Sequence, residues 1–212
     1  MYQEVFIKDD SNSFQLEDFL AKYKEYSNGY FKIQVTTIDN SELKDGDYDY
    51  KRNNNEFTIE PIWKKNKEKI INVYYILNGE LHCEDGPAFI RKEYNGSRIE
   101  CAQEQYYKNG LTHRDDGPAE TEYRFEKKKK IMVSERYFVG GKLHRDGGPA
   151  EIFYDDGAVE TYSHYKNGKL HNENGPAKYT CEYGDHNYTF ALNDERLLYE
   201  DYFKKLKTKL YW

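Results

Sequence analysis

The chain has 212 residues, of which 37% are hydrophobic, 33% are charged and 17% are aromatic, and its formal charge is −6. General nucleic-acid binding and binding to an anionic membrane both need a basic field, so this acidic balance argues against them. No apolar run approaches the ~20 residues of a membrane span and the start is acidic, so we expect a cytoplasmic protein without membrane insertion.

Residues 1–70 are predicted to form an N-terminal α/β cap or a small separate domain. Ser13 can cap a helix that runs to about Tyr26, because Leu16, Leu20 and Tyr23 recur on one side of that helix. Strands and irregular segments complete the region: strands at 30–37 and 56–63, loops at 39–49 and 51–55, and a connector from residue 64.

One nine-residue pattern recurs four times within residues 71–190. It occurs as ELHCEDGPA, LTHRDDGPA, KLHRDGGPA and KLHNENGPA, with the glycine before proline at positions 86, 117, 148 and 175. A histidine stands five residues before each proline, at positions 82, 113, 144 and 171. Such a period is typical of repeat architectures, in which each unit buries itself only against its neighbours.

Each unit is predicted to contain short antiparallel strands. An aromatic strand ends in Asn-Gly or Gly-Gly, pairs that tolerate the positive φ angles of a two-residue hairpin turn. A return strand leads to the histidine, and Gly-Pro makes a second reversal in which glycine supplies the conformation. Alternation after the proline, as in Ala119, Thr121 and Tyr123, indicates a third strand. Further turns are expected at Asn95-Gly96, Asp156-Gly157, Gly184-Asp185 and 127–130.

Residues 191–212 are predicted to be a degenerate repeat followed by a capping helix. LNDERLL echoes LNGELHC, the start of the first unit, and Leu198, Tyr202, Leu206 and Leu210 then recur at four-residue steps. Residues 71–190 show no helical period. The predicted fold is therefore mainly β: an extended antiparallel meander of hairpin repeats with an N-terminal α/β cap and a C-terminal capping helix.

The phrase NGKLHNENGPA at 167–177, with its variants in the other units, resembles the MORN-like repeat of proteins from giant DNA viruses, bacteriophages and some bacteria. The resemblance covers roughly residues 72–197. It implies a β-sheet scaffold of viral or phage type without an activity of its own. A host-interaction, counter-defence or virion role follows, with a location in the host cytoplasm or the virion.

The candidate binding residues follow the repeat. If the units stack, imidazole, guanidinium and carboxylate groups form a row that can bind an anionic ligand or a charged strip on a partner. The interpretation we favour is that each histidine donates to a turn carbonyl and braces the Gly-Pro corner of its own unit. The candidate residues are His82, His113, Arg114, Asp115, His144, Arg145, Asp146 and His171, together with the aromatic residues Tyr107, Phe138 and Tyr165.

Metal binding and catalysis find little support in the sequence. Equivalent histidines are expected roughly 10–14 Å apart, too far to share one ion, so no metal or cofactor is expected. No G-x-S-x-G, phosphate-binding glycine loop or H-E-x-x-H is present. The three cysteines lack C-x2-C spacing and are expected to be reduced thiols. The crude candidates for an enzyme in the N-terminal region are Asp39, Glu42 and Asp45 with His186.

Three functions are compatible with these patterns. The favoured one is a non-enzymatic scaffold that binds a protein partner along an exposed face or edge of the sheet. The second is a small-ligand or nucleotide sponge acting against host defence signalling, with Arg114, Arg145 and the histidines around a pocket. The third is an enzyme that uses the N-terminal region. Exposed sheet edges also favour a homo-oligomer.

Overall fold

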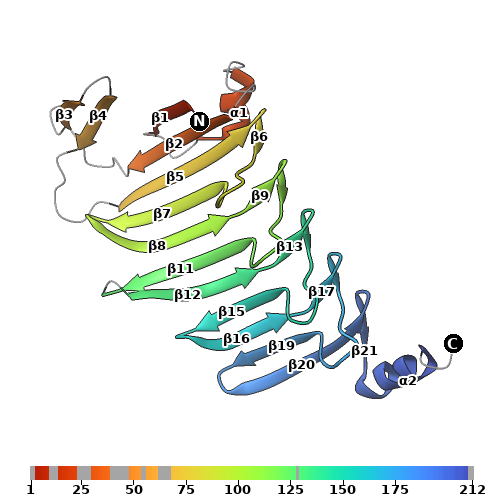
Figure 1. Ribbon diagram of the computed structural model, residues 1–212. Coiled ribbons are helices and arrows are strands. Elements are labelled where there is room, and N and C mark those ends of the chain that lie inside the picture. Colours follow the sequence, from red (N-terminus) through yellow and green to blue (C-terminus); the bar gives the residue numbers. More distant parts are fainter. Residues whose placement is uncertain are drawn as a thin grey trace.

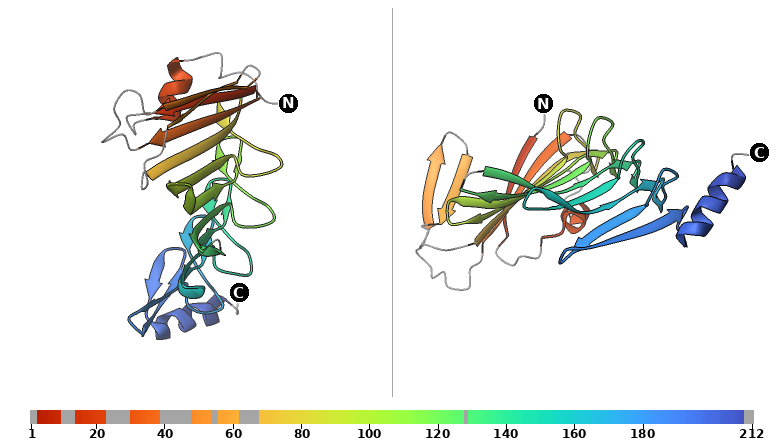
Figure 2. Two further views of the ribbon diagram at one scale, coloured as in Figure 1. Left: turned by 90° about the vertical axis from the view of Figure 1, so that its left-hand side faces the viewer. Right: turned by 90° about the horizontal axis from the view of Figure 1, so that it is seen from below.

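The protein is an elongated β-sheet built by repetition. A computed structural model of the chain describes residues 3–9, 14–22, 30–38, 48–53, 56–61, 68–127 and 129–209. Within these residues, 13 strands form one main sheet, and its strands follow one another from the N-terminal end to the C-terminal helix (Figure 1). Two further views show that the sheet is a single layer over most of its length (Figure 2). The predicted fold class is confirmed.

The main sheet is antiparallel except at its first pair. β1 (Gln3–Asp9) pairs in parallel with β2 (Tyr30–Ile38), and β2 pairs antiparallel with β5 (Glu68–Leu77). The sheet then continues through β7 (Phe89–Asn95), β8 (Arg98–Gln105), β11 (Glu120–Glu126), β12 (Lys129–Arg136), β15 (Glu151–Asp155), β16 (Ala158–Ser163), β19 (Lys178–Glu182), β20 (Asp185–Leu192) and β21 (Glu195–Leu197).

Each repeat adds a long hairpin to the sheet and a short hairpin beside it. The short hairpins stand in a row along one side of the sheet (Figure 1). Three are separate, and β6 (Glu80–Leu81) and β21 complete one at each end by pairing with β5 and β20. The three separate hairpins are β9 (Tyr107–Lys108) with β10 (Leu111–Thr112), β13 (Phe138–Val139) with β14 (Lys142–Leu143), and β17 (Tyr165–Lys166) with β18 (Lys169–Leu170).

The turns of the short hairpins follow their sequence. In the second unit, Asn109 and Gly110 have φ angles of 51° and 73°, the two positive values that a type I′ turn requires. At the end of the array, Asn193 and Asp194 have φ angles of 53° and 70°. The predicted Asn-Gly and Gly-Gly turns and the degenerate fifth hairpin are therefore confirmed.

The turns of the long hairpins are predicted less accurately. Asp156 and Gly157 form the expected turn, with φ angles of 48° and 86°. The turn between β19 and β20 lies at Tyr183 and Gly184, one residue earlier than expected, because Tyr183 adopts the first positive φ angle, 51°. The first three long hairpins also carry a one-residue register shift, which the sequence did not predict. Such a bulge increases the local twist of the strands.

The N-terminal region continues the sheet of the repeats. β2 pairs with β5 along its whole length, so residues 30–38 lie against the first unit. Ile33, Val35 and Ile76 are fully buried there, and α1 (Leu16–Lys22) packs its Phe19 and Leu20 against them. This cluster is the largest apolar core among the described residues, and it covers one face at this end of the sheet.

Several predictions for this region are wrong or lie outside the described residues. β1 was not predicted, and part of the expected loops forms β3 (Tyr48–Asn53), which pairs with β4 (Glu56–Pro61) in a separate hairpin. Strand pairing stabilises β3 despite its polar composition. β5 begins within the expected connector, at residue 68, and crosses the expected boundary at residue 70. Ser13, residues 23–26 and residues 64–67 lie outside the described residues.

The C-terminal helix covers the last strands. α2 is Tyr199–Lys209, and its Tyr202 is fully buried, with its ring centroid 5.0 Å from that of Phe190. The Tyr202 hydroxyl donates to the Asn172 carbonyl (2.9 Å) and accepts from the Gly175 N–H (3.1 Å). Leu198, expected on the buried side, is 77% exposed because the helix begins after it, and Leu210 lies outside the described residues. Neither α1 nor α2 is long and apolar enough to cross a membrane.

The alanine after each Gly-Pro is the tightest point of the repeat. Ala88, Ala119, Ala150 and Ala177 have no exposed surface. At Ala150 the carbonyl accepts from Tyr137 (2.7 Å) and the N–H donates to Ser163 (2.9 Å), so the chain is held between two neighbouring segments. Complete burial between two hydrogen-bonded segments disfavours a larger side chain, which explains why alanine recurs.

Replacing this alanine tests the packing. Ala150→Leu should lower the free energy of unfolding by about 1–3 kcal/mol, because a larger side chain forces neighbouring backbone apart. Ala158→Leu, at an exposed position of β16, is the matched control and should change stability little. Urea denaturation followed by circular dichroism measures both, and equal effects of the two variants would contradict the packing account.

Candidate functional site

The four repeated histidines connect successive units. Nδ1 of each accepts a hydrogen bond from the backbone N–H of the first turn residue in the next short hairpin. The donor–acceptor distances are 3.2 Å from Asn109 to His82, 3.1 Å from Gly140 to His113, 3.0 Å from Asn167 to His144 and 3.1 Å from Asn193 to His171. The favoured prediction, donation to a carbonyl within the same unit, is wrong: Nδ1 is an acceptor, and its partner lies in the next unit.

The second N–H of each turn is also bound by the preceding unit. Gly110 donates to the Leu81 carbonyl at 3.0 Å, and Gly141 donates to the Thr112 carbonyl at 2.9 Å. Gly168 and Asp194 repeat this bond with Leu143 and Leu170. Backbone N–H groups need acceptors, and here one unit supplies both acceptors for the turn of the next. We call this pair of bonds the inter-unit clamp.

The clamp determines which imidazole nitrogen carries the proton. Because Nδ1 accepts, the neutral ring must hold its hydrogen on Nε2. Nε2 faces the carboxylate two residues further along the chain, at 3.1 Å for His113–Asp115 and 3.2 Å for His171–Glu173. The same distance is 3.6 Å for His144–Asp146 and 3.9 Å for His82–Glu84. Protonating Nδ1 would replace this acceptor by a second donor and break the clamp.

The arginines brace the Gly-Pro corner instead of the histidines. The Arg145 guanidinium lies 3.8 Å from the Tyr137 ring centroid and donates to the Pro149 carbonyl at 3.2 Å. Arg114 makes the same contacts with the Tyr106 ring (4.0 Å) and the Pro118 carbonyl (3.4 Å). In the fourth unit Asn172 bonds the Pro176 carbonyl at 2.9 Å. The corner brace predicted for histidine therefore exists in the second, third and fourth units, but the residue after the histidine provides it.

The glycine of this corner makes room for the arginine. Gly86, Gly117 and Gly148 do not adopt a positive φ angle, so the expectation that glycine supplies an unusual conformation is wrong at these three positions. A Cβ atom on Gly117 would lie 3.2 Å from Arg114 Cζ, and one on Gly148 would lie 3.4 Å from Arg145 Cζ. The glycine and the arginine are therefore parts of one packed corner.

The predicted aromatic binding residues lie on the inner face of the short hairpins. Tyr107, Phe138 and Tyr165 pair across their hairpins with Thr112, Leu143 and Leu170, and all three aromatic side chains are half-buried. Burial raises the pKa of the Tyr107 hydroxyl. Their position favours a structural role over direct contact with a partner.

The outer face of the same hairpins is exposed and differs between units. Leu111 is 53% exposed and Val139 is 46% exposed. Sequence reasoning missed these two residues, because strands of two residues are too short to show an alternating pattern. We call the exposed residues of the three separate hairpins the outer hairpin surface: Lys108, Leu111, Val139, Lys142, Lys166 and Lys169.

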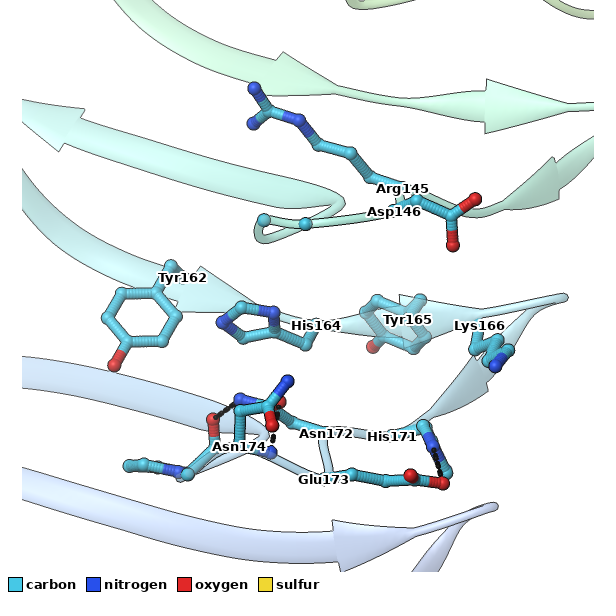
Figure 3. Close-up of a pocket in the computed structure, with 14 residues that line it drawn as sticks. Arg145, Asp146, Tyr162, His164, Tyr165, Lys166, His171, Asn172, Glu173 and Asn174 are labelled. Carbon is cyan, nitrogen blue, oxygen red and sulfur yellow. Dashed lines mark hydrogen bonds and ion pairs between the residues drawn. The ribbon is translucent and has the colours of Figure 1, made fainter.

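Grooves open between the loops of successive units. One of about 670 Å³ lies between the loops after His82 and His113, and another of about 450 Å³ lies between the loops after His144 and His171. In the second groove the Arg145 guanidinium is directed away from the opposite wall, where His171 and Asn172 lie (Figure 3). Asp146 and Glu173 also line this groove, so its walls combine both signs of charge.

His164, in the second groove, differs from the equivalent residues of the preceding units. It takes the place that Tyr106 and Tyr137 have in the preceding units, and its ring centroid lies 5.5 Å from that of Tyr162. Burial lowers the pKa of the His164 imidazole, a hydrogen bond with the Gly148 backbone raises it, and the charge of Arg145 lowers it, with burial the largest effect. The net shift keeps this imidazole neutral to lower pH.

The remaining sequence candidates do not assemble into a site. Asp39, Glu42 and Asp45 lie outside the described residues, and His186 Nδ1 lies 2.9 Å from the Tyr179 hydroxyl near the C-terminal end of the sheet. All three cysteines are free thiols. Across the part of the chain that the structure describes, no three His, Cys, Asp or Glu residues are grouped so as to hold a metal ion.

Comparison with known proteins adds no assignment. No protein-family model, curated protein or solved structure matches the chain significantly.

Removing one histidine tests the inter-unit clamp. His113→Ala should lower the free energy of unfolding by about 0.5–1.5 kcal/mol, because the Gly140 N–H loses its acceptor. Asp115→Ala is the matched control, since it removes the Nε2 partner but leaves the Nδ1 bond intact. Thermal and urea unfolding measure the stability of both variants. An equal loss in His113→Ala and Asp115→Ala would contradict the clamp.

Acidification tests the environment of His164. Because its pKa is below the ordinary 6.5 in the folded protein, the unfolded chain binds more protons, and stability falls as pH decreases from about 6.5 through the folded pKa. His164→Tyr, which restores the residue of the other units, should lose less stability than the native chain over this range. Parallel pH profiles of the two unfolding free energies would show that His164 is not the cause.

Proposed function

We propose that this protein is a non-enzymatic repeat scaffold that binds a protein partner through the outer hairpin surface. The observation that carries the proposal is that buried and exposed positions of the repeat differ in how much their residues vary. The residues common to the units make contacts inside the protein, whereas the exposed residues beside each turn differ from unit to unit.

The common residues have defined internal contacts. His113 binds the next turn and Ala119 is fully buried. Arg114, which the third unit repeats as Arg145, packs on Tyr106. None of these contacts uses the outer face of the short hairpin. A scaffold that repeats its interior and varies its exterior can present a specific surface without altering its fold.

The chemistry of the outer hairpin surface indicates the kind of partner. Leu111 and Val139 provide exposed apolar groups, and four lysines surround them although the whole chain is acidic. A complementary partner surface carries apolar side chains bordered by carboxylates. The resemblance to viral and phage repeat proteins directs the search to host proteins and virion components.

The small-ligand function has less support. It requires basic side chains that converge in a pocket. Arg114 and Arg145 are instead stacked on tyrosine rings and bonded to proline carbonyls in their own units. The groove of about 450 Å³ is also lined by carboxylates, which oppose an anionic ligand.

An affinity experiment with matched variants tests the proposal. The tagged native chain is compared with Leu111→Asp/Val139→Asp in a lysate of the native host, with mass spectrometry of the captured proteins. We expect a stoichiometric protein to be retained by the native chain and reduced at least tenfold by the double variant, because charges replace apolar contacts.

Val159→Asp controls for a general effect of an added carboxylate. Val159 is 43% exposed but lies in β16 of the main sheet, away from the short hairpins. This variant should capture the same protein as the native chain. If both variants behave alike, or if heat releases a stoichiometric metabolite and no protein is captured, the outer hairpin surface is not the binding site.

A further inference from the structure

The two ends of the main sheet are closed differently. At the C-terminal end α2 packs beside β21, and Lys205 forms an ion pair with Glu195 of that strand. At the N-terminal end β1 pairs with β2 and, among the described residues, with no other strand. α1 packs against the face of the sheet through Phe19 and Leu20, and not along the outer side of β1.

β1 lacks two of the features that usually protect an edge strand, a proline and a bulge, and its charged residues stand on either side of an apolar centre. It is seven residues long, contains no proline, and keeps an unbroken register with β2 from Gln3 to Asp9. Its centre is the apolar run Val5, Phe6 and Ile7, and Phe6 is 56% exposed. Long and partly apolar edges of this kind tend to pair with another strand.

The sequence of β1 is complementary to itself when it is read antiparallel. With Phe6 at the centre, Glu4 lies opposite Lys8, Val5 lies opposite Ile7, and Gln3 lies opposite Asp9. Moving the centre to Val5 or Ile7 would place Phe6 opposite Glu4 or Lys8 and would lose both charge pairs. Only the register centred on Phe6 therefore pairs unlike charges and joins apolar residues to apolar residues.

We infer that β1 pairs antiparallel with β1 of a second copy of this chain, so that two sheets continue as one. A two-fold axis perpendicular to the sheet at Phe6 keeps corresponding faces together. Val5 and Ile7, which pack on the core under α1, then meet on one face, and the exposed Phe6 meets its equivalent on the other. Directly paired side chains on one face lie about 4.5–5.5 Å apart at Cβ, close enough for this aromatic contact.

The charge pairs give the interface its specificity. Symmetry places Glu4 opposite Lys8 of the second copy twice. Glu4 already binds Lys32 of its own chain at 2.8 Å, so in the dimer its carboxylate lies between two ammonium groups. Cross-strand pairs of opposite charge stabilise a sheet, whereas like charges directly opposite destabilise it.

Light scattering after size-exclusion chromatography tests this interface. The native chain should have twice the mass of the single chain, 25.3 kDa, at high micromolar concentration. Lys8→Glu should yield the single-chain mass, because it places carboxylates opposite each other. Lys92→Glu, an exposed charge reversal in β7, should remain dimeric.

A charge swap separates pairing from a folding defect. Glu4→Lys/Lys8→Glu/Lys32→Glu restores opposite charges across the two copies and also within each chain, so it should recover the dimer lost in Lys8→Glu. A native chain that stays monomeric, a dimer that survives Lys8→Glu, or a charge swap that stays monomeric would each overturn the inference. Circular dichroism should show the same fold in all variants.

A cysteine cross-link tests the register directly. Phe6→Cys should form a disulfide-linked dimer on mild oxidation, because the two positions face each other. Gln3→Cys is the control and should not, because its equivalent lies at the opposite end of the paired strands. Absence of the Phe6→Cys cross-link would exclude this register. Partner capture through Leu111 and Val139 is measured separately, so either proposal can fail without the other.

Discussion

The inter-unit clamp is the interaction on which the rest of this structure depends. A single-layer sheet has no second layer to bury its side chains, so the units must be held by bonds to their neighbours. Each short hairpin turn after the first presents two N–H groups to the preceding unit. That unit binds one with the histidine Nδ1 and the other with the carbonyl of the residue before that histidine. This arrangement makes each turn the point at which the next unit is positioned, and it occurs at every unit boundary of the array.

The clamp determines how the other repeated residues are used. A histidine committed to the next turn cannot brace its own corner, so Arg114 and Arg145 stack on tyrosines and bind the proline carbonyls there. Glycine leaves space for the guanidinium, and alanine closes the junction with the sheet. The proposed partner-binding surface consists of residues that the clamp does not need, namely the outer face of the short hairpins. This surface has a regular backbone geometry, and its side chains differ from unit to unit.

The array is not symmetric at its ends. At the C-terminus Tyr202 of α2 binds the backbone of the last loop through its hydroxyl, and Asp194 replaces glycine while keeping a positive φ angle. The final unit is therefore covered by its own chain. At the N-terminus α1 covers a face of the sheet, and among the described residues β1 pairs with β2 alone. This difference explains how one end can stop the repetition while the other can extend the sheet through a second copy.

The sequence by itself determined the repetition and its turns. At the short hairpins the Asn-Gly and Gly-Gly pairs adopt the two positive φ angles of a two-residue turn. The positions of these hairpins, the meander and the C-terminal helix therefore followed from local preferences. The sequence also singled out His113, but it assigned to this histidine the corner brace that Arg114 provides.

Only the tertiary structure decided the partners of these residues. The Nδ1 atom of His113 and the N–H of Gly140 come from different units, and no local pattern reveals a bond between them. Contacts across units likewise place Tyr107 inside the hairpin row and leave Leu111 outside it. The strands β1 and β3 were also missed, and their partners β2 and β4 are neighbours that only the fold shows. Backbone conformation is set mainly by neighbours in the chain, whereas burial and hydrogen-bond partners are set by neighbours in space.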